Sequence, residues 1–182
     1  MSDSQKPNDF VQLGRTFHEL AKHARESDSF DLNQTIVTGP RLSWEDLLKG
    51  FRTVILSEAG TGKTEEIRQT AKRLRAAGAR AFFLRLEHIP DAFEDAFEVS
   101  TFDEFEQWLS STDEAWLLLD SVDEARLRNP GDFERAVRKL GRRIQAGNAQ
   151  AHIVLTGRTS AWRAKTDLAL CETYFPIVPE TM

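Results

Sequence analysis

The chain has 182 residues, of which 40% are hydrophobic and 29% are charged, and these proportions are typical of one ordinary globular domain. Its net charge of −5 argues against a general nucleic-acid binder, which needs a basic surface. No apolar run approaches the roughly 20 residues of a membrane span, and the first residues carry no apolar signal region, so we expect a cytoplasmic protein. The single cysteine, Cys171, excludes an internal disulfide and is interpreted as a small buried apolar residue.

The N-terminal segment, residues 1–42, is predicted to be partly disordered, with one helix and one extended stretch. Apolar residues recur at helical spacing over residues 9–25, and residues 32–37 are expected to be extended. A capping-box pattern at Ser43 then predicts the start of a short helix. We therefore place the main domain at residues 43–182.

The stretch from Thr53 to Thr64 predicts a strand, a glycine-rich loop and the start of a helix. Backbone N–H groups of such a loop hydrogen-bond phosphate oxygens, and the positive end of the helix favours the anion. Lys63 offers a cation to the outer phosphates, and Thr64 offers a hydroxyl to Mg²⁺. Ser57 stands where the usual pattern G-x-x-x-x-G-K-[ST] has its first glycine. The candidate phosphate-binding residues are Glu58, Ala59, Gly60, Thr61, Gly62, Lys63 and Thr64.

The next part of the chain predicts a second strand and two short helices. Residues 81–86 form an apolar strand, residues 92–97 are spaced as a short helix, and a capping box at Thr101 predicts another. The aromatic residues here have core spacing and are not interleaved with basic residues. That pattern again argues against a nucleic-acid platform.

A continuous apolar run over residues 115–119 predicts a strand that is buried on both faces of a parallel sheet. It ends in Asp120, at the carboxyl end where open α/β sheets bind ligands. A carboxylate there can hold Mg²⁺, directly or through water. A second carboxylate, Asp123 or Glu124, can accept a proton from an attacking water. Asp120 is therefore a candidate metal ligand together with Thr64, and the other two are catalytic candidates.

The C-terminal part predicts a helix over residues 133–144, a strand over residues 152–156 and a helix over residues 162–170. Arg158 stands just past the strand, where a guanidinium can sense or stabilise phosphate charge, and it is a third catalytic candidate. Residues 174–179 are predicted to form a fifth strand at a sheet edge. The expected fold class is α/β, with a mostly parallel five-stranded sheet.

Three motifs in this order resemble those of P-loop NTPases of the STAND class, and most closely their NACHT-type domains. The loop at residues 58–64 looks like that family's Walker A motif. Residues 117–124, Leu-Leu-Leu-Asp-Ser-Val-Asp-Glu, resemble its extended Walker B motif, and residues 155–158 resemble its sensor strand. The resemblance covers residues 53–178. It implies the three-layer sandwich of a P-loop NTPase, with the sensor strand between the first strand and the Walker B strand.

The resemblance also implies a ligand and partners. The nucleotide would be ATP or GTP, with Mg²⁺ as the cofactor. NACHT-type proteins continue with helical and winged-helix parts that close over the nucleotide, so we expect the chain to be part of a larger signalling or defence protein. Its expected partners are the nucleotide, other domains of the parent chain and further copies in a nucleotide-dependent homo-oligomer, with no membrane. By this resemblance Lys63 and Thr64 bind the triphosphate and Mg²⁺, Asp120 coordinates the metal, Asp123 or Glu124 activates water, and Arg158 is the sensor.

Three functions stay open on the sequence. The first is slow Mg²⁺-dependent hydrolysis of the nucleotide by a switch module. The second is a nucleotide-binding switch without appreciable hydrolysis. The third is a small-molecule or nucleoside kinase, in which Arg126 and Arg128 would serve as lid arginines. The spacing Asp-x-x-Asp-Glu favours water activation over this third reaction.

Overall fold

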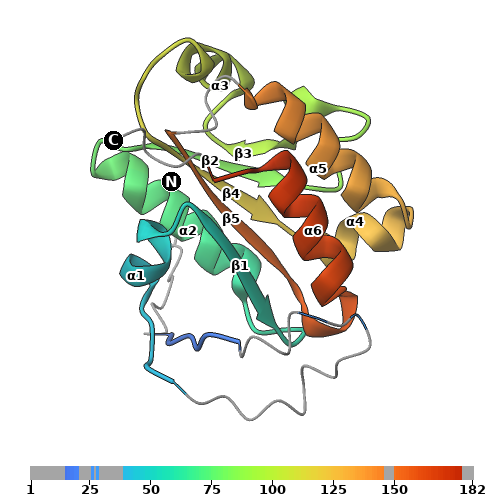
Figure 1. The fold of residues 1–182 in the computed structure, drawn as a ribbon. Coiled ribbons are helices and arrows are strands. Elements are labelled where there is room, and N and C mark those ends of the chain that lie inside the picture. The colour runs from blue at the N-terminus through green and yellow to red at the C-terminus, as the bar shows by residue number, and fades with distance from the viewer. Residues whose placement is uncertain (1–14, 21–25, 27, 29–38, 146–149, 178–182) are drawn as a thin grey trace, which may run out of the picture.

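The computed structural model describes residues 15–20, 26, 28, 39–145 and 150–177, and in it helices cover both faces of one five-stranded sheet (Figure 1). The strands are β1 (Arg52–Ser57), β2 (Arg80–Arg85), β3 (Phe97–Val99), β4 (Ala115–Asp120) and β5 (Ala151–Arg158). The helices are α1 (Trp44–Lys49), α2 (Lys63–Ala76), α3 (Phe102–Leu109), α4 (Val122–Arg128), α5 (Asp132–Arg143) and α6 (Ala164–Tyr174). Two short 3₁₀ helices are η3 (Phe93–Ala96) and η5 (Thr159–Ala161). The predicted α/β class and the mostly parallel sheet of five strands are confirmed.

The order of the strands is β1-β5-β4-β2-β3, and only β3 runs antiparallel to its neighbour. In the parallel part, Ser57 lies opposite Arg158 and Arg85 lies opposite Asp120. The carboxyl ends of β1, β5, β4 and β2 therefore meet at one edge of the sheet. Strand β5 lies between β1 and β4, which is the expected place of the strand that ends in Arg158.

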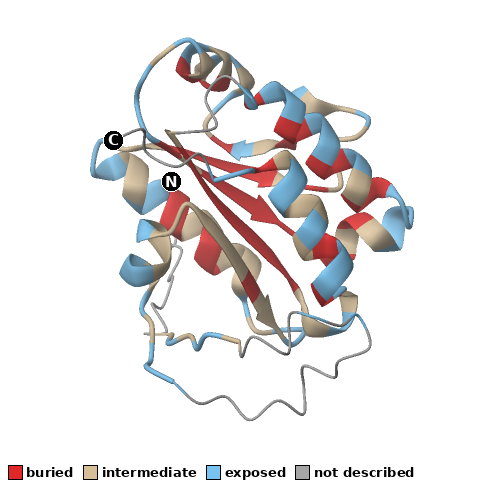
Figure 2. Cartoon of the chain, in the orientation of Figure 1, coloured by how far each residue is buried: buried red, intermediate tan, exposed pale blue. Residues whose placement is uncertain are grey.

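The core has two halves, one on each face of the sheet (Figure 2). In β4, Leu117 and Leu119 belong to the larger cluster, beneath α3, α4, α5 and α6, and Leu118 belongs to the smaller cluster on the side of α2. All three side chains are fully buried. The prediction of a strand buried on both faces is confirmed, because alternate side chains of an extended chain point to opposite faces.

Both predicted capping boxes are present. The Ser43 hydroxyl accepts a hydrogen bond from the Asp46 N–H at 3.3 Å, and the Asp46 carboxylate accepts one from the Ser43 N–H at 2.9 Å. Thr101 and Glu104 exchange the same pair at the start of α3, at 3.2 and 3.1 Å. Each box satisfies N–H groups that a helix start otherwise leaves without partners, so local sequence alone fixed these two starts.

The helix predicted near the N-terminus is wrong within the described residues. Residues 15–20 are not helical, because Phe17 pairs with Leu42 through two backbone hydrogen bonds of 2.8 Å. The rest of the predicted helix at 9–25 and the whole of the extended stretch at 32–37 lie outside the described residues. The described part of the N-terminal segment docks on the main domain, since the Asp28 carboxylate accepts hydrogen bonds from the first turn of α6.

The fifth strand is real but comes from another part of the chain. Strand β3 and the 3₁₀ turn before it replace the helix predicted at 92–97. The predicted strand at 174–179 is wrong where it is described, because Tyr174 ends α6 and buried Phe175 joins the larger cluster. Helix α6 packs so closely on α5 that a side chain on Gly141 would meet the Tyr174 carbonyl oxygen at 2.6 Å. This tertiary contact, rather than the local β-propensity, decides the conformation of the segment.

Candidate functional site

The glycine-rich loop connects the end of β1 to the start of α2, as predicted. Gly60 and Gly62 have φ angles of +72° and +77°, which lie in the left-handed region that favours glycine. A Cβ atom at either position would meet nothing within 4 Å, so backbone conformation, not crowding, requires these glycines. Gly62 caps α2 without a side-chain hydrogen bond. The N-cap residue thus offers no side chain to the N–H groups of the first turn, and a helix start of this kind can bind an anion.

Ser57, which replaces the usual first glycine, closes the loop. Its hydroxyl lies 3.0 Å from the Thr61 hydroxyl, which in turn donates to the Glu58 carbonyl oxygen at 3.2 Å. The Glu58 side chain accepts a hydrogen bond of 2.7 Å from the Thr159 hydroxyl, so the loop is also tied to the end of β5. Glu58 and Ala59 are both exposed.

Lys63 folds back over the loop. Its Nζ lies 3.3 Å from the Glu58 carbonyl oxygen and 3.5 Å from that of Ser57. Burial lowers the pKa of the Lys63 ammonium, and the nearby carboxylates of Asp123 and Asp120 oppose that shift. A cation above the mouth of this loop faces the position that an outer phosphate takes in a phosphate-binding loop.

Asp120 is fully buried and holds two hydroxyl groups at the end of β4. Its Oδ2 accepts a hydrogen bond of 2.6 Å from Thr64 Oγ1, and its Oδ1 accepts one of 2.5 Å from Thr156 Oγ1. The sequence predicted the pair Thr64 and Asp120 from two motifs that are 56 residues apart, and the fold brings them into contact. A carboxylate with a hydroxyl at its side is a donor set that suits Mg²⁺.

The two carboxylates that the sequence proposed as catalytic candidates, Asp123 and Glu124, lie in the first turn of α4. Asp123 is buried and uses both oxygens on Arg158: one lies 2.8 Å from the guanidinium Nε, and the other accepts the Arg158 backbone N–H at 3.1 Å. Arg158 is the last residue of β5, which extends two residues beyond the predicted end of the strand at 156. This pair therefore ties the start of α4 to the end of β5.

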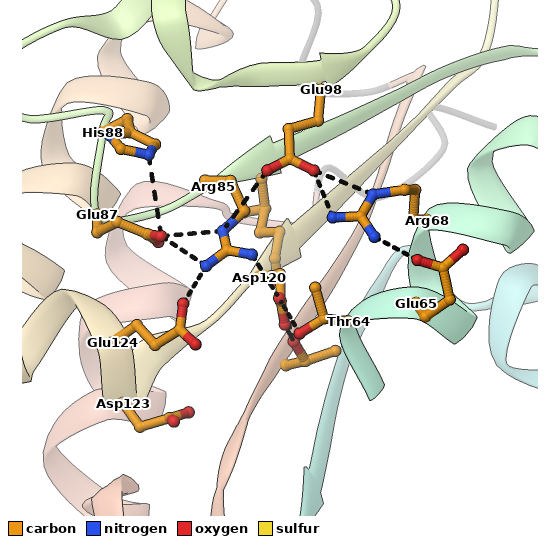
Figure 3. A network of polar contacts seen from close by, with 12 residues as sticks. Thr64, Glu65, Arg68, Arg85, Glu87, His88, Glu98, Asp120, Asp123 and Glu124 are labelled. Carbon is orange, nitrogen blue, oxygen red and sulfur yellow. Dashed lines mark hydrogen bonds and ion pairs between the residues drawn. The ribbon is translucent and has the colours of Figure 1, made fainter. Parts of the chain in front are cut away.

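Glu124 points the other way, toward Arg85 at the end of β2, with which it forms a hydrogen-bonded ion pair (Figure 3). Its side chain is 39% exposed. Burial raises the pKa of the Glu124 carboxyl, Arg85 opposes the rise, and the negative charges of Glu87 and Asp120 add to it. A carboxylate with a raised pKa is a better proton acceptor than an ordinary one.

Two side chains near the loop were missed by the sequence analysis. Arg85 could have been noticed as a charge at the end of an apolar strand. Arg15 carries no such signal: its guanidinium donates to the Thr61 carbonyl oxygen, and its Nε lies 2.5 Å from a Glu66 carboxylate oxygen on α2. Trp44 donates from its indole N–H to the same carboxylate at 2.8 Å. The N-terminal segment thus contacts the loop, through a residue that only the tertiary structure places there.

The site does not coincide with the most clearly formed hollow found on the described surface. That hollow, of about 1030 Å³, lies between α5 and the segment 90–95, and none of the predicted site residues lines it. Within the described residues, no group of three or more His, Cys, Asp or Glu side chains could hold a metal ion by itself. An ion at Thr64 and Asp120 would need further oxygen ligands, which phosphates and water supply in such sites.

Comparison of the chain with protein-family models, with curated proteins and with solved structures gave no match. Among the described residues, no helix is both long and apolar enough to cross a membrane. The fold gathers every candidate residue that the sequence predicted at the carboxyl edge of the sheet, on the ends of β1, β4 and β5 and the starts of α2 and α4.

Proposed function

We propose that the chain is a P-loop nucleotide-binding domain that binds ATP or GTP with Mg²⁺ and hydrolyses it slowly, as the switch module of a larger signalling or defence protein. The observation that carries the proposal is the 2.6 Å hydrogen bond between Thr64, the second residue of α2, and Asp120, the last residue of β4. It joins a glycine-rich loop with a free helix start to a buried carboxylate. These are the parts that hold a triphosphate and its metal ion.

Each site residue has a proposed role in binding or hydrolysis. Loop N–H groups and Lys63 would hold the phosphates, Thr64 and Asp120 would hold Mg²⁺, and Arg158 would face the terminal phosphate. The bound Mg²⁺ would neutralise charge on the phosphate oxygens. A water oxygen would attack the γ-phosphorus while the bond from that phosphorus to the bridging oxygen breaks. Glu124 would accept the proton of that water.

The geometry favours Glu124 over Asp123 as the proton acceptor. Both oxygens of Asp123 are engaged by Arg158, and its side chain is almost completely buried. Glu124 is more exposed, it has a raised pKa, and only one of its oxygens is engaged by Arg85. Asp123 would therefore be a positioning residue, which holds Arg158 in place beside the start of α4.

The binding test is titration calorimetry of the chain with ATP and MgCl₂, and then with GTP. We expect Lys63→Ala to weaken binding by roughly tenfold or more, because a charge-assisted contact to phosphate is lost. Lys72→Ala is the matched control, since Lys72 lies exposed on the same helix and should leave binding unchanged. Equal binding by both variants would contradict the proposed phosphate site.

A nucleotide switch without appreciable hydrolysis is the second candidate, because both acidic residues of α4 are held in ion pairs. Glu124→Gln separates the two. If the chain hydrolyses the nucleotide, this variant should lose turnover by about 10²–10⁴-fold and keep its affinity. If turnover of the unaltered chain is already negligible, the switch is the better description.

The kinase alternative has less support than the other two functions. Arg126 forms a bidentate pair with Asp167 on α6, and Arg128 contacts Asp91 and the Glu87 carbonyl oxygen. To act as lid arginines, both guanidinium groups would have to leave these partners. Proposed partners, beyond the nucleotide, are other domains of the parent chain and further copies in a nucleotide-dependent oligomer, and the proposed location is the cytoplasm.

A further inference from the structure

One guanidinium at the carboxyl edge of the sheet faces four carboxylates. Arg85 contacts Glu87 at 2.7 Å, lies 3.8 Å from Asp120 and 4.0 Å from Glu98, and is hydrogen-bonded to Glu124 (Figure 3). These five residues are called the Arg85 cluster below. The Arg85 side chain is only 16% exposed, so its charge is less screened than that of a surface arginine.

The cluster draws Glu124 away from the glycine-rich loop. The charges that act most strongly on Lys63 are Asp123, Asp120, Arg158 and Arg15, and Glu124 is not among them. Figure 3 shows the Glu124 side chain directed toward Arg85, while Asp123, one residue earlier, points to another side. The proton acceptor of the proposed reaction is therefore held in a resting position.

A row of side chains with alternating charges also connects the cluster to the first turn of α2, which directly follows the loop. Glu98 on β3 contacts Arg68 on α2 at 2.6 Å, and Arg68 is paired with Glu65, which directly follows Thr64. The weakest step of this row is the 4.0 Å separation between Glu98 and Arg85. A shift in the first turn of α2 would thus change the charges that face Arg85.

We propose that Arg85 is a positioning residue that restrains Glu124 in the nucleotide-free protein, and that binding of Mg²⁺ and nucleotide releases Glu124 from it. This inference rests on the proposed function. The physical reason is competition for one acidic site. Arg85 lies 3.8 Å from Asp120, so it would be repelled and would be needed less as a counter-charge if Asp120 and Thr64 held Mg²⁺. Arg85 then holds Glu124 less tightly.

The first experiment measures the coupling between Arg85 and Glu124 without any turnover. Melting temperatures are recorded for the unaltered chain, Arg85→Gln, Glu124→Gln and the double variant. In the nucleotide-free protein we expect the double variant to melt about 2–4 °C higher than the sum of the single effects predicts, because the second change removes no further pair. With MgCl₂ and a non-hydrolysable ATP analogue, this coupling should be largely but not completely lost. The restraint that remains in the nucleotide-bound state is what Arg85→Gln removes in the second experiment.

The second experiment asks whether Arg85 lowers kcat by restraining Glu124 or raises kcat by supporting catalysis. Under restraint, Arg85→Gln should raise kcat roughly fivefold with little change in nucleotide affinity, and Arg85→Lys should give a smaller increase. Arg80→Gln is the matched control, because Arg80 lies at the opposite end of β2 in an exposed pair with Asp113. A fall of kcat in Arg85→Gln, or a kcat equal to that of the control, would overturn the proposal.

The failures of the two proposals give different results. If the chain binds nucleotide and the coupling persists undiminished in the presence of Mg²⁺ and the analogue, Glu124 is not released and only this inference is overturned. If the unaltered chain shows no binding that depends on Lys63, the proposed function fails and release by nucleotide fails with it. Coupling that is absent already in the nucleotide-free protein would overturn the restraint itself.

Discussion

Helix α4 contributes to two arginine–carboxylate clusters that differ in charge balance and in exposure. On one side, Arg126 is 10% exposed and binds the fully buried Asp167 through both nitrogens, with Glu134 as a further partner. On the other side, Glu124 belongs to the Arg85 cluster, in which one guanidinium faces four carboxylates and Glu124 stays 39% exposed. The first pairing is called the Arg126 cluster below.

Both clusters pair an arginine with carboxylates, but the excess of negative charge is larger in the second. In the Arg126 cluster, Asp167 also accepts the Arg163 N–H at 2.7 Å, so the buried carboxylate is well satisfied and α4 is fastened to α6. In the Arg85 cluster negative charge is in excess at the edge where a ligand is expected. A satisfied buried pair resists change, whereas a partly exposed cluster with unbalanced charge can respond to an added cation. The following predictions test this contrast, beginning with the largest effect.

Asp167→Ala should lower the free energy of unfolding by about 3–5 kcal/mol, because it leaves the buried Arg126 guanidinium without its main partner. Urea unfolding followed by circular dichroism measures the loss. The control is Asp113→Ala, which removes the exposed partner of Arg80 and should cost less than about 1 kcal/mol. Similar losses in the two variants would remove the contrast between buried and exposed pairs.

Replacing both partners should be far less harmful than replacing one. In the double variant Arg126→Met with Asp167→Leu, the buried pair itself is gone, and Glu134 keeps Arg163 at 4.0 Å. We therefore expect the double variant to regain most of the stability that Asp167→Ala loses. The same urea titration measures this. A double variant as unstable as the single one would mean that packing around Phe133, over which Arg126 lies at 4.7 Å, dominates the cost.

Cys171 on α6 is a reporter for this side of the molecule. Burial raises the pKa of its thiol from 9.0 to about 12, with Asp167 adding to the shift. Between pH 9 and 12 the unfolded chain ionises this thiol while the folded chain keeps it protonated, so this group makes stability fall as pH rises. Alkylation at pH 8 should be at least about tenfold slower in the native protein than in urea. A native rate equal to the unfolded rate would contradict the raised pKa and the burial behind it.

The smallest expected effect belongs to the Arg85 cluster. Arg85→Gln should cost about 1–2 kcal/mol in the nucleotide-free protein, which is less than the cost of Asp167→Ala. Of the four carboxylates that lose their counter-charge, Glu87 and Asp120 are little exposed, but Glu124 and Glu98 are partly exposed and can be hydrated. The cost should shrink between 0.05 and 0.5 M NaCl, where the Debye length falls below about 14 Å. The cost of Asp167→Ala should hardly change over the same range. Equal salt dependence of the two costs would show that the clusters are screened alike.

The sequence by itself determined much of the sheet and of the site. Apolar runs gave four of the strands, two capping boxes gave helix starts, and the order glycine-rich loop, Asp120 and Arg158 placed chemistry at strand ends. These are local signals: the 2-residue period, side-chain caps and left-handed glycines depend on neighbours along the chain. Because parallel strands share one carboxyl edge, the contact between Thr64 and Asp120 also followed from them.

Only the tertiary structure decided the rest. Strand β3 exists because its residues pair with β2, and the segment at Tyr174 stays helical because α6 packs against Gly141 of α5. Arg85 meets Glu124 because strand register sets it opposite Asp120. None of these partners is near in sequence. Asp123 and Glu124, which the sequence could not tell apart, differ in the structure for the same reason: Asp123 pairs with an arginine of β5, and Glu124 pairs with an arginine of β2.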